Sequence, residues 1–574
     1  MSDHSAVPHN LRRYVVEQDY AEYSEIDQAV WRFVLLQNYQ RLAQTAHPAY
    51  ANGLAKTGIS VERIPRIAEM SACLQRFGWS AVCVDGFIPP RAFQEFQAAS
   101  ILPIAADMRT KDHLRYTPAP DIIHEAAGHA PILPDPRYAA YLRAIGEVGK
   151  KAFSSAEDAR VYAAIFELSE VKETRDVKPE AVALAEARLA RALSEVSYTS
   201  EASRLSRLYW WTAEYGLVGT PRDYKLYGAG LLSSLWESHA CHDPEVQKVP
   251  LTAACVEVAY DITRPQPQLF VVRDFEELFS VLNDVDAGLV HHQGGDAALS
   301  AALKSEEVAS FLFPGEAFVI GELRALSGTA KQGVLTFQGQ VGRGASGRLS
   351  ERFDAPNAGY RLPIGPLADG VLLGSLTPDQ LRANYQRGPR VRLHFASDVE
   401  LEGELEAVTQ NERGQVLAAR FKDYSLRSER AGFGEQGASY LLCAASELLT
   451  AHAGAIDPSF FPETEATGVR VPKPRTMAEG ERALLALYER AVAALRGTLG
   501  SSVDVAFAGI YRELAANFAD EWLLRWNLLE SLCKHGQRGA LSRTLEEELA
   551  RLEVRFAYRE PIATGLRYLA SLAA

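Results

Sequence analysis

The chain has 574 residues, of which 47% are hydrophobic and 23% are charged, enough for about four domain-sized cores. This composition excludes an intrinsically disordered chain and a collagen-like one. Acidic residues outnumber basic ones by 73 to 60, a net charge of −13. Because such a charge repels phosphate backbones, we expect no nucleic-acid partner.

The first segment indicates where the protein works. Residues 1–25 are polar and lack the apolar core of a signal peptide, and no later segment offers the roughly 18 uninterrupted apolar residues of a membrane span. The six cysteines include no CxxC pair, so a disulfide framework and a zinc ribbon are both excluded. We expect an N-terminal tail over 1–25, reduced cysteines and a cytoplasmic protein without a membrane partner.

Residues 26–305 show a mostly helical pattern. Apolar side chains recur at steps of three and four, as at Val30, Phe33 and Val34, and strand-like runs are few and short. From 306 to 455 the period changes to two: Val391 and Leu393 alternate with polar neighbours, which predicts a small antiparallel β domain. Its wetted face is expected to carry Glu400, Glu402, Glu404 and Glu406.

The last third divides at a proline-rich stretch. Residues 456–478 contain four prolines and little periodicity, which is typical of an extended linker. Beyond it, Leu484, Leu487 and Leu495 fall near one helical face. Residues 479–574 are therefore predicted to form a C-terminal helical domain.

The most informative stretch is RYTPAPDIIHEAAGHAPILPDPRY, which contains His124, Glu125 and His129. A zinc metalloprotease helix places its histidines four residues apart, whereas here they are five apart. On an ideal helix, the second histidine would therefore lie about 140° around the axis from the first. That spacing excludes an undistorted metalloprotease face. Gly128 could let the helix end or deform so that the imidazoles converge. From this stretch alone, a metal pair and two hydrogen-bonded core histidines are equally good interpretations.

A second stretch, RLYWWTAEYGLVG, places Glu214 among aromatic and aliphatic residues. A buried carboxylate there is costly unless a cation compensates it. A metal ion shared with the two histidines would do so, and an ion pair with Arg204 or Arg207 is the alternative. Two imidazoles and one carboxylate leave about three octahedral positions open, which suits non-haem Fe(II).

With these motifs the sequence resembles the pterin-dependent aromatic amino acid hydroxylases. The matching stretches run in order over about residues 26–290: DGFIPPRAF, MRTKDHLRYTPAPDIIHEAAGH, YWWTAEYGL, KLYGAGLLSSLWE and YDITRPQPQLFVV. The resemblance implies a mainly α catalytic domain of the aromatic amino acid hydroxylase type over 26–305, with Fe(II) and a tetrahydropterin as cofactors. The expected fold class is multidomain α+β, in which this domain precedes the β domain and a C-terminal helical bundle.

The resemblance also assigns roles. It makes His124, His129 and Glu214 the iron ligands, and Arg109 the arginine that holds the substrate carboxylate through its bidentate fork. The remaining positions of the implied amino acid pocket are Tyr116, Thr117, Trp210, Ser233 and Ile262. The positions implied to lie at the pterin are Gly86, Ile88, Phe93 and Glu125.

Some positions depart from the family pattern. Pro103 stands where many members have a histidine, and Ala126 and Ala127 stand where two leucines are usual. The regulatory domain that precedes the catalytic domain in animal members has no counterpart, so its mode of regulation is not expected.

Substrate choice depends on two positions. Ile262 stands where tyrosine-specific relatives tend to carry an acidic residue, and Trp210 resembles the phenylalanine and tyrosine enzymes rather than the tryptophan ones. Together they imply a phenylalanine 4-monooxygenase whose partners are the amino acid, O2 and the pterin. The alternatives are tryptophan or tyrosine hydroxylation, a metal hydrolase with Glu125 as base, and a non-catalytic homologue that acts as a binding protein.

Residues 306–574 match no family on their motifs. We expect packing, substrate-access or oligomerisation roles for them, with a homo-oligomer formed through this half. His291 and His292, in LVHHQGG, are expected to form a solvated turn rather than a metal site.

Overall fold

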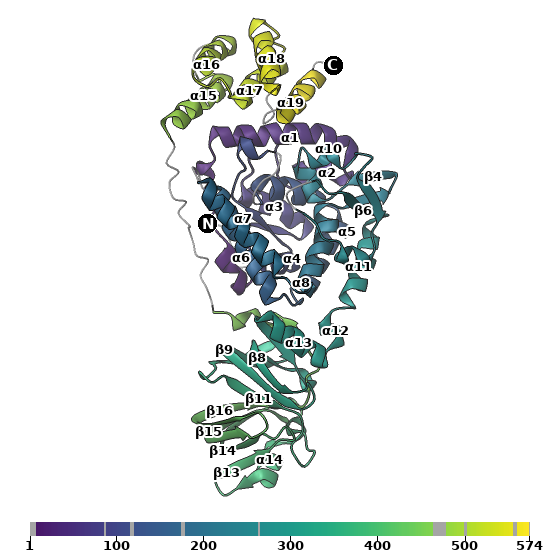
Figure 1. The fold of residues 1–574 in the computed structure, drawn as a ribbon, viewed down its shortest axis with the longest axis vertical. Helices are drawn as coiled ribbons and strands as arrows, with labels where there is room; N and C mark the ends of the chain where they lie inside the picture. The colour runs from purple at the N-terminus through teal and green to yellow at the C-terminus, as the bar shows by residue number, and fades with distance from the viewer. Residues whose placement is uncertain are drawn as a thin grey trace.

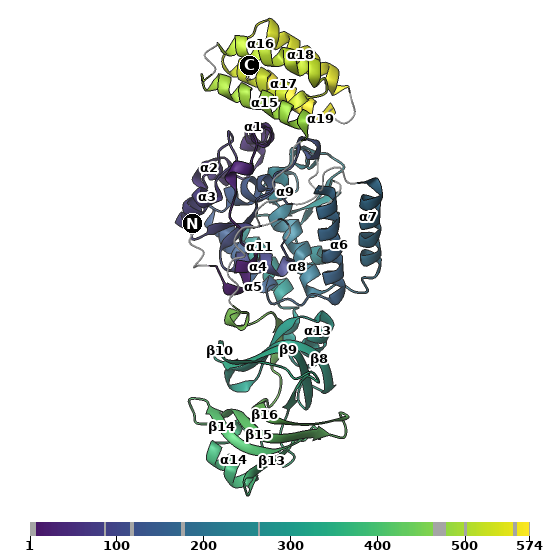
Figure 2. The same ribbon diagram turned by 90° about the vertical axis from the view of Figure 1, so that its left-hand side faces the viewer.

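The computed structural model describes the chain except residues 1–6, 85, 87, 115–119, 174–177, 262–264, 463–477, 499–501, 555–558 and 573–574. Three parts follow one another along its long axis (Figures 1 and 2). A helical part lies in the middle, a β part lies at one end and the C-terminal helices lie at the other. We refer to them below as the helical part, the β part and the C-terminal bundle.

The helical part is built around α1 (Glu25–Thr45), which begins at a capping box formed by Ser24 and Asp27. Its other main helices are α2 (Ala49–Lys56), α3 (Ile67–Leu74), α4 (Pro90–Ala98), α5 (Pro136–Gly149), α6 (Ala156–Glu173), α7 (Pro179–Ser194), α8 (Glu201–Tyr209), α9 (Ala229–Ser233), α10 (Glu237–Ala240) and α11 (Phe275–Asp286). The mainly helical pattern predicted for this region agrees with these elements.

Two small sheets complete the helical part. The strands β1 (Ser80–Val84) and β2 (Ile101–Ala105) pair in parallel. The second sheet has the order β4-β3-β6-β5, and its strands are β3 (Leu217–Thr220), β4 (Asp223–Leu226), β5 (Gln247–Pro250) and β6 (Gln268–Val272). Short strands of this kind leave little periodicity in the sequence, which is why they were not predicted.

From Val7 onward the N-terminal segment is packed, which corrects the expectation of a tail for the described part of residues 1–25. Val7, Leu11 and Val15 are buried in one cluster with Val82 and Val84 of β1. Leu11 lies on a 3-10 helix, His9–Tyr14, and Val15 forms an isolated antiparallel bridge with Val84. The segment is therefore part of the helical part.

The β part consists of antiparallel strands in a six-stranded and a five-stranded sheet. The first sheet contains β7 (Val308–Leu312), β8 (Ala317–Gly328), β9 (Gly333–Ala345), β10 (Arg348–Asp354), β11 (Tyr360–Ile364) and β17 (Thr450–Ala453). The second contains β12 (Gln386–Arg387), β13 (Arg390–His394), β14 (Glu400–Gln410), β15 (Val416–Ser428) and β16 (Phe433–Cys443). One helix, α14 (Pro378–Tyr385), precedes β12.

The glutamates of β14 take part in cross-strand ion pairs. Glu402 lies 2.7 Å from Arg392, and Glu406 lies 3.0 Å from Lys422. The predicted wetted face is thus a face of alternating charges.

The boundary between the helical part and the β part lies earlier than residue 306. Helix α13 (Gly295–Ser305) places Ala298, Leu299 and Ala302 in the hydrophobic core of the β part. An amphipathic helix does not reveal from its sequence which domain its apolar face will cover. For this reason the sequence analysis placed α13 in the helical domain, whereas its apolar residues lie in the core of the β part.

The C-terminal bundle packs against α1. Its helices are α15 (Glu479–Leu495), α16 (Val503–Asn517), α17 (Trp522–Lys534), α18 (Ala540–Glu553) and α19 (Arg559–Ser571). Phe33 of α1 meets the edges of Trp522 and Trp526 with ring centroids 5.0 and 4.8 Å apart. Arg32 also reaches the fully buried carboxylate of Glu530, at 3.1 Å. The bundle and the helical part therefore share one hydrophobic core.

Two further expectations concern bonding and membranes. All six cysteines are free thiols, as predicted. Among the described residues, none of the helices combines the length and the apolar character needed to cross a bilayer.

Candidate metal centre

His124, Glu125 and His129 lie on a π-helical segment, Ile123–His129. A π-helix links residues i and i+5, so a side chain five positions on lies close above the first. The helix deforms in the way that the five-residue spacing requires. Gly128 allows the π-helical segment to pack closely against Ala229. A Cβ at position 128 would come within 2.7 Å of the Ala229 carbonyl oxygen. Its role is close packing against α9 rather than ending the helix.

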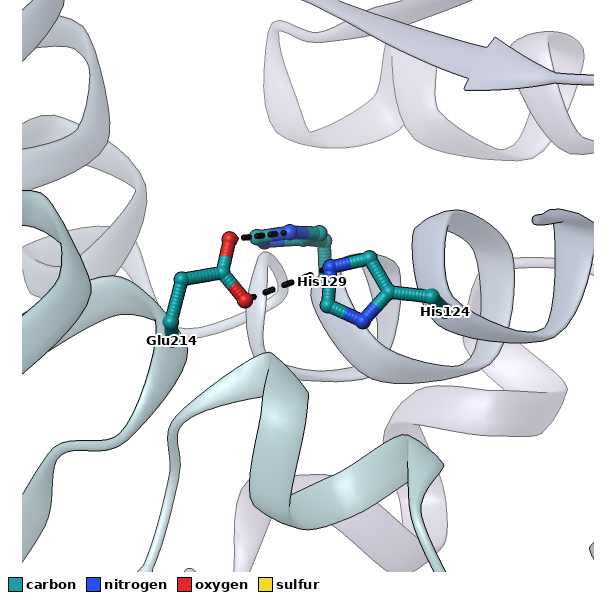
Figure 3. Close-up of side chains that lie close together, drawn as sticks. All are labelled: His124, His129 and Glu214. Carbon is teal, nitrogen blue, oxygen red and sulfur yellow. Dashed lines mark ion pairs between the residues drawn. The ribbon is translucent and has the colours of Figure 1, made fainter. Parts of the chain in front are cut away.

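Glu214 ends a second π-helical segment, Trp210–Glu214, which continues α8. Its Oε2 lies 3.2 Å from His124 Nε2 and its Oε1 lies 3.1 Å from His129 Nε2 (Figure 3). The alternative partners are engaged elsewhere: Arg204 pairs with Glu257 at 3.0 Å, and Arg207 donates to the Val256 carbonyl. Glu214 is therefore a partner of the two histidines.

The three side chains have the spacing of a metal site. Ligand atoms held about 2.1 Å from one ion at angles of about 90–110° lie about 2.9–3.4 Å apart, and the carboxylate oxygens fall in this range. One donor atom from each residue lies within 4.8 Å of the others. Apart from their contacts with one another, the described residues supply no hydrogen-bond partner for His129 Nε2 or Glu214 Oε2, although both atoms are buried. Two imidazoles and a carboxylate arranged in this way fit a divalent transition metal.

The electrostatics of the group follow from burial and mutual attraction. Burial alone would raise the pKa of Glu214, but His129 and His124 outweigh it and hold the pKa below its ordinary value. Burial opposes a charged His124, yet the Glu214 carboxylate outweighs it and raises the pKa of His124 to about 9. For Glu125, burial is the larger influence and raises its pKa. In the metal-free chain, a protonated His124 thus compensates the buried Glu214 carboxylate, and a metal ion bound by both side chains would take over that role.

Ser233, a predicted residue of the amino acid pocket, contacts His124 directly. Its Oγ lies 3.1 Å from His124 Nδ1 and donates to the Ala229 carbonyl at 2.8 Å. Because the hydroxyl hydrogen goes to Ala229, the oxygen is left to accept from His124 Nδ1–H. That arrangement leaves the Nε2 lone pair directed at a metal. The resemblance placed Ser233 in the amino acid pocket and did not indicate this contact.

Arg109 forms a buried pair with Asp121, a residue that the sequence analysis missed. The guanidinium donates from Nε and Nη2 to the two carboxylate oxygens, each at 2.7 Å. Asp121 also accepts from the backbone N–H of His124 at 3.1 Å. Burial alone would raise the pKa of Asp121, but Arg109 outweighs it and lowers that pKa. Asp121 thus joins Arg109 to the π-helix, and its position three residues before His124 is the signal that could have found it.

Aromatic rings line the surroundings of the group. Phe93 packs edge-on against Tyr209, with centroids 5.6 Å apart, and its ring centroid is 6.4 Å from that of His129. Trp210 stacks on Tyr260 at 4.2 Å with an interplanar angle of 10°. Tyr260 and Tyr209 were not predicted, because aromatic residues in a helical pattern are as typical of a core.

The remaining predicted positions are distributed as follows. Glu125 lies beside His129, with Oε2 and Nε2 3.9 Å apart. Ile88 packs against the cluster of Val82 and Val84, and Gly86 adopts a positive φ of 57° after β1. Tyr116, Thr117 and Ile262 lie outside the described residues.

Comparison with known proteins points to one family. The model of the biopterin-dependent aromatic amino acid hydroxylases matches residues 13–200 and 185–290. A phenylalanine-4-hydroxylase of Pseudomonas aeruginosa is 28% identical over 285 residues, which is 49% of this chain and 92% of that protein. One of Ralstonia nicotianae is 29% identical over 269 residues, which is 46% of this chain and 72% of that protein.

Among solved structures, a Chromobacterium violaceum phenylalanine hydroxylase with bound oxidized Fe(III) is 26% identical to this chain. The match covers 48% of this chain and 86% of that one, with a TM-score of 0.38. A second structure of the same enzyme, which has bound iron(III) and 7,8-dihydrobiopterin, gives the same values.

Proposed function

Because residues 13–290 belong to the biopterin-dependent aromatic amino acid hydroxylase family, we propose that this chain is a pterin-dependent monooxygenase that converts L-phenylalanine to L-tyrosine. The metal would be a non-haem Fe(II) held by His124, His129 and Glu214. The observation that supports this most directly is the convergence of these three largely buried side chains, whose donor atoms lie within 4.8 Å of one another.

The ligand set suits an oxidation. In this family, a ferrous ion and a tetrahydropterin supply the activation of O2 for hydroxylation of an aromatic ring. The residues of the chain position the reactants and exclude water. His129 and Glu214 are well suited to this, since both side chains are almost completely buried.

The substrate carboxylate is assigned to Arg109. Its Nε and Nη2 are bonded to Asp121, which fixes the plane of the guanidinium and leaves the Nη1 side for a second carboxylate. Trp210 would form an apolar wall of the amino acid pocket, to which Tyr116, Thr117, Ser233 and Ile262 would contribute. The pterin would lie against Phe93, near Gly86, Ile88 and Glu125.

Preference for phenylalanine is the finer part of the proposal. It is supported by the names of the relatives and by the absence of an acidic residue at position 262, where Ile262 stands. An apolar pocket discriminates only weakly between aromatic rings. Hydroxylation of tryptophan or tyrosine is therefore an outcome that the experiment must separate.

The test is anaerobic loading of the full chain with Fe(II), followed by O2, tetrahydropterin and each aromatic amino acid in turn, with chromatography of the products. We expect tyrosine from phenylalanine only when the pterin is present. Product formation that is unchanged when the pterin is omitted would contradict the proposal. A chain that binds phenylalanine but yields no product would favour the binding-protein alternative.

A further inference from the structure

A second group with the same donor types lies at the junction of the helical part and the β part. Asp286 is the last residue of α11, and His291 and His292 belong to α12 (Val290–Gln293). His291 Nε2 lies 3.4 Å from Asp286 Oδ1, and His292 Nε2 lies 2.9 Å from Asp286 Oδ2. The histidines thus occupy a short helix and converge on one carboxylate, instead of forming the solvated turn that the sequence suggested.

The backbone that carries these histidines is held from two sides. The carboxylate of Glu201, at the start of α8, accepts from the Val290 backbone N–H at 2.6 Å. On the other side, Thr450 of β17 donates its hydroxyl to the His291 carbonyl at 2.7 Å. Both anchors come from elements distant in sequence, so the two imidazoles are placed by the fold.

The separations fit an ion rather than only a hydrogen-bonded triad. The range of 2.9–3.4 Å is again about that of ligand atoms around one metal ion at about 2.0–2.2 Å. Of the described residues, none supplies a hydrogen-bond partner for Asp286 Oδ1 or for His291 Nδ1, although both atoms are buried. The hydrogen bond between His292 Nε2 and Asp286 Oδ2 leaves Asp286 Oδ1 without one, and a bound ion would satisfy that oxygen.

The neighbouring charges are compatible with a cation. Glu201 contributes a negative charge near Asp286, and Lys151 contributes a positive charge near His291.

We propose that Asp286, His291 and His292 bind a divalent transition metal ion, of which zinc is the representative, at the junction of the helical part and the β part. His292 is half exposed, which leaves the remaining coordination positions to water. Since nothing in this open site imposes a geometry, its affinities should follow the intrinsic order in which copper, nickel and zinc exceed iron and manganese.

The ion would join two elements that are otherwise connected through residues 287–289. One end of the site is the C-terminus of α11 in the helical part, and the other is α12, which packs against β17 of the β part. Binding would therefore fix the connection between the two parts. The site is independent of the proposed oxygenase activity.

The test compares zinc content in three forms of the full chain: wild type, the double variant His291→Asn/His292→Asn, and the control His394→Asn, which removes an exposed imidazole on β13. Each is stripped with a chelator, dialysed against micromolar Zn²⁺ and analysed by elemental mass spectrometry. We expect the double variant to bind one zinc per chain fewer than wild type, and the control to equal wild type. Equal zinc content in all three forms would overturn the proposal.

A second measurement guards against misfolding of the double variant. Asp286→Asn removes one ligand charge while keeping the shape of the side chain, and we expect it to lose the same zinc equivalent with an unchanged circular dichroism spectrum. Full zinc binding by a folded Asp286→Asn chain would also overturn the proposal. Tyrosine formation with Fe(II) and pterin, measured on the same variants, should stay at the wild-type level, so a failure of the oxygenase proposal would be seen separately.

Discussion

Among the residues that the structure describes, two groups of two imidazoles and one carboxylate lie in different settings. The inner group, His124, His129 and Glu214, is brought together from two π-helical segments far apart in sequence. The outer group is formed by Asp286 and two residues that follow it closely. The most exposed side chain of the inner group is 20% accessible, whereas that of the outer group is 49% accessible.

The comparison teaches that donor types alone do not define what a metal site can do. The inner group has a partner for the far nitrogen of His124 in Ser233 and a brace for its backbone in Asp121. Such outer partners orient ligands and tune the metal. The backbone of the outer group is fixed, but its side chains are open to water. Such a site suits a structural ion that links α11 to α12. Reactions that must exclude water belong to the inner group.

The largest expected effect is the loss of the inner carboxylate. Glu214→Gln keeps the shape but leaves two imidazoles without an anion, and removal of one partner of a buried charged group costs about 3–5 kcal/mol. We expect affinity for Fe(II) to fall on the order of 10²- to 10⁴-fold and tyrosine formation to fall with it. Glu406→Gln, which removes a carboxylate from a surface ion pair with Lys422, is the matched control and should change neither. Normal iron content in a folded Glu214→Gln chain would refute the ligand assignment.

Much of the inner group could be predicted from residue types and motif order. Two closely spaced histidines and a glutamate in an apolar run indicated a shared cation, and the structure brings these three side chains together. The way they converge could not be read from an ideal helix, because a π-helical turn is selected by packing around it. Gly128 against Ala229 is part of that packing.

The larger organisation was harder to predict wherever it depends on contacts between distant residues. The period-two pattern was enough to predict antiparallel strands in the β part. The packing of Trp522 and Trp526 on Phe33 was not predictable, because an amphipathic helix does not specify which surface it will cover. The outer group was misread for a related reason, since the anchors that hold its helix come from Glu201 and Thr450.

A smaller effect is expected when the orientation of a ligand is lost while the ligand itself is kept. Ser233→Ala removes the acceptor of His124 Nδ1, and loss of such a partner typically lowers metal affinity by about 10- to 100-fold. Titration with Fe(II) under anaerobic conditions measures this. Ser375→Ala, which removes an exposed hydroxyl in the β part bonded to the Leu372 carbonyl, is the control. An unchanged Fe(II) affinity in Ser233→Ala would show that the contact between Ser233 and His124 does not contribute to metal binding.

The two groups should also differ in pH dependence. In the metal-free chain, Glu214 overcomes the effect of burial and raises the pKa of His124 to about 9, so the imidazole carries a proton at pH 7.5 that a metal must displace. Inner affinity should therefore rise about tenfold per pH unit and level off above about pH 9. Burial lowers the pKa of His291, so no proton leaves it at pH 7.5.

Calorimetry in buffers of different ionisation enthalpy measures the protons released. We expect close to one proton from His124 on Fe(II) binding to the inner group, and none from His291 on Zn²⁺ binding to the outer group. To isolate the outer group, the proton release of the double variant His291→Asn/His292→Asn on zinc titration is subtracted from that of wild type. Equal proton release at the two groups would remove this distinction between them.

The smallest effect is expected from His292→Asn alone. His292 is the most exposed ligand of the outer group, and in the absence of metal its exposed pair with Asp286 should contribute less than about 1 kcal/mol to the free energy of unfolding. Thermal unfolding without metal should therefore match wild type. With zinc present, wild type gains stability in proportion to the logarithm of the zinc concentration, and the variant should gain less. Because the ion would link α11 to α12, the difference should appear as greater protease sensitivity at residues 287–289 in the zinc-loaded variant than in zinc-loaded wild type. If zinc protects this connection equally in both chains, His292 is not a ligand of the ion.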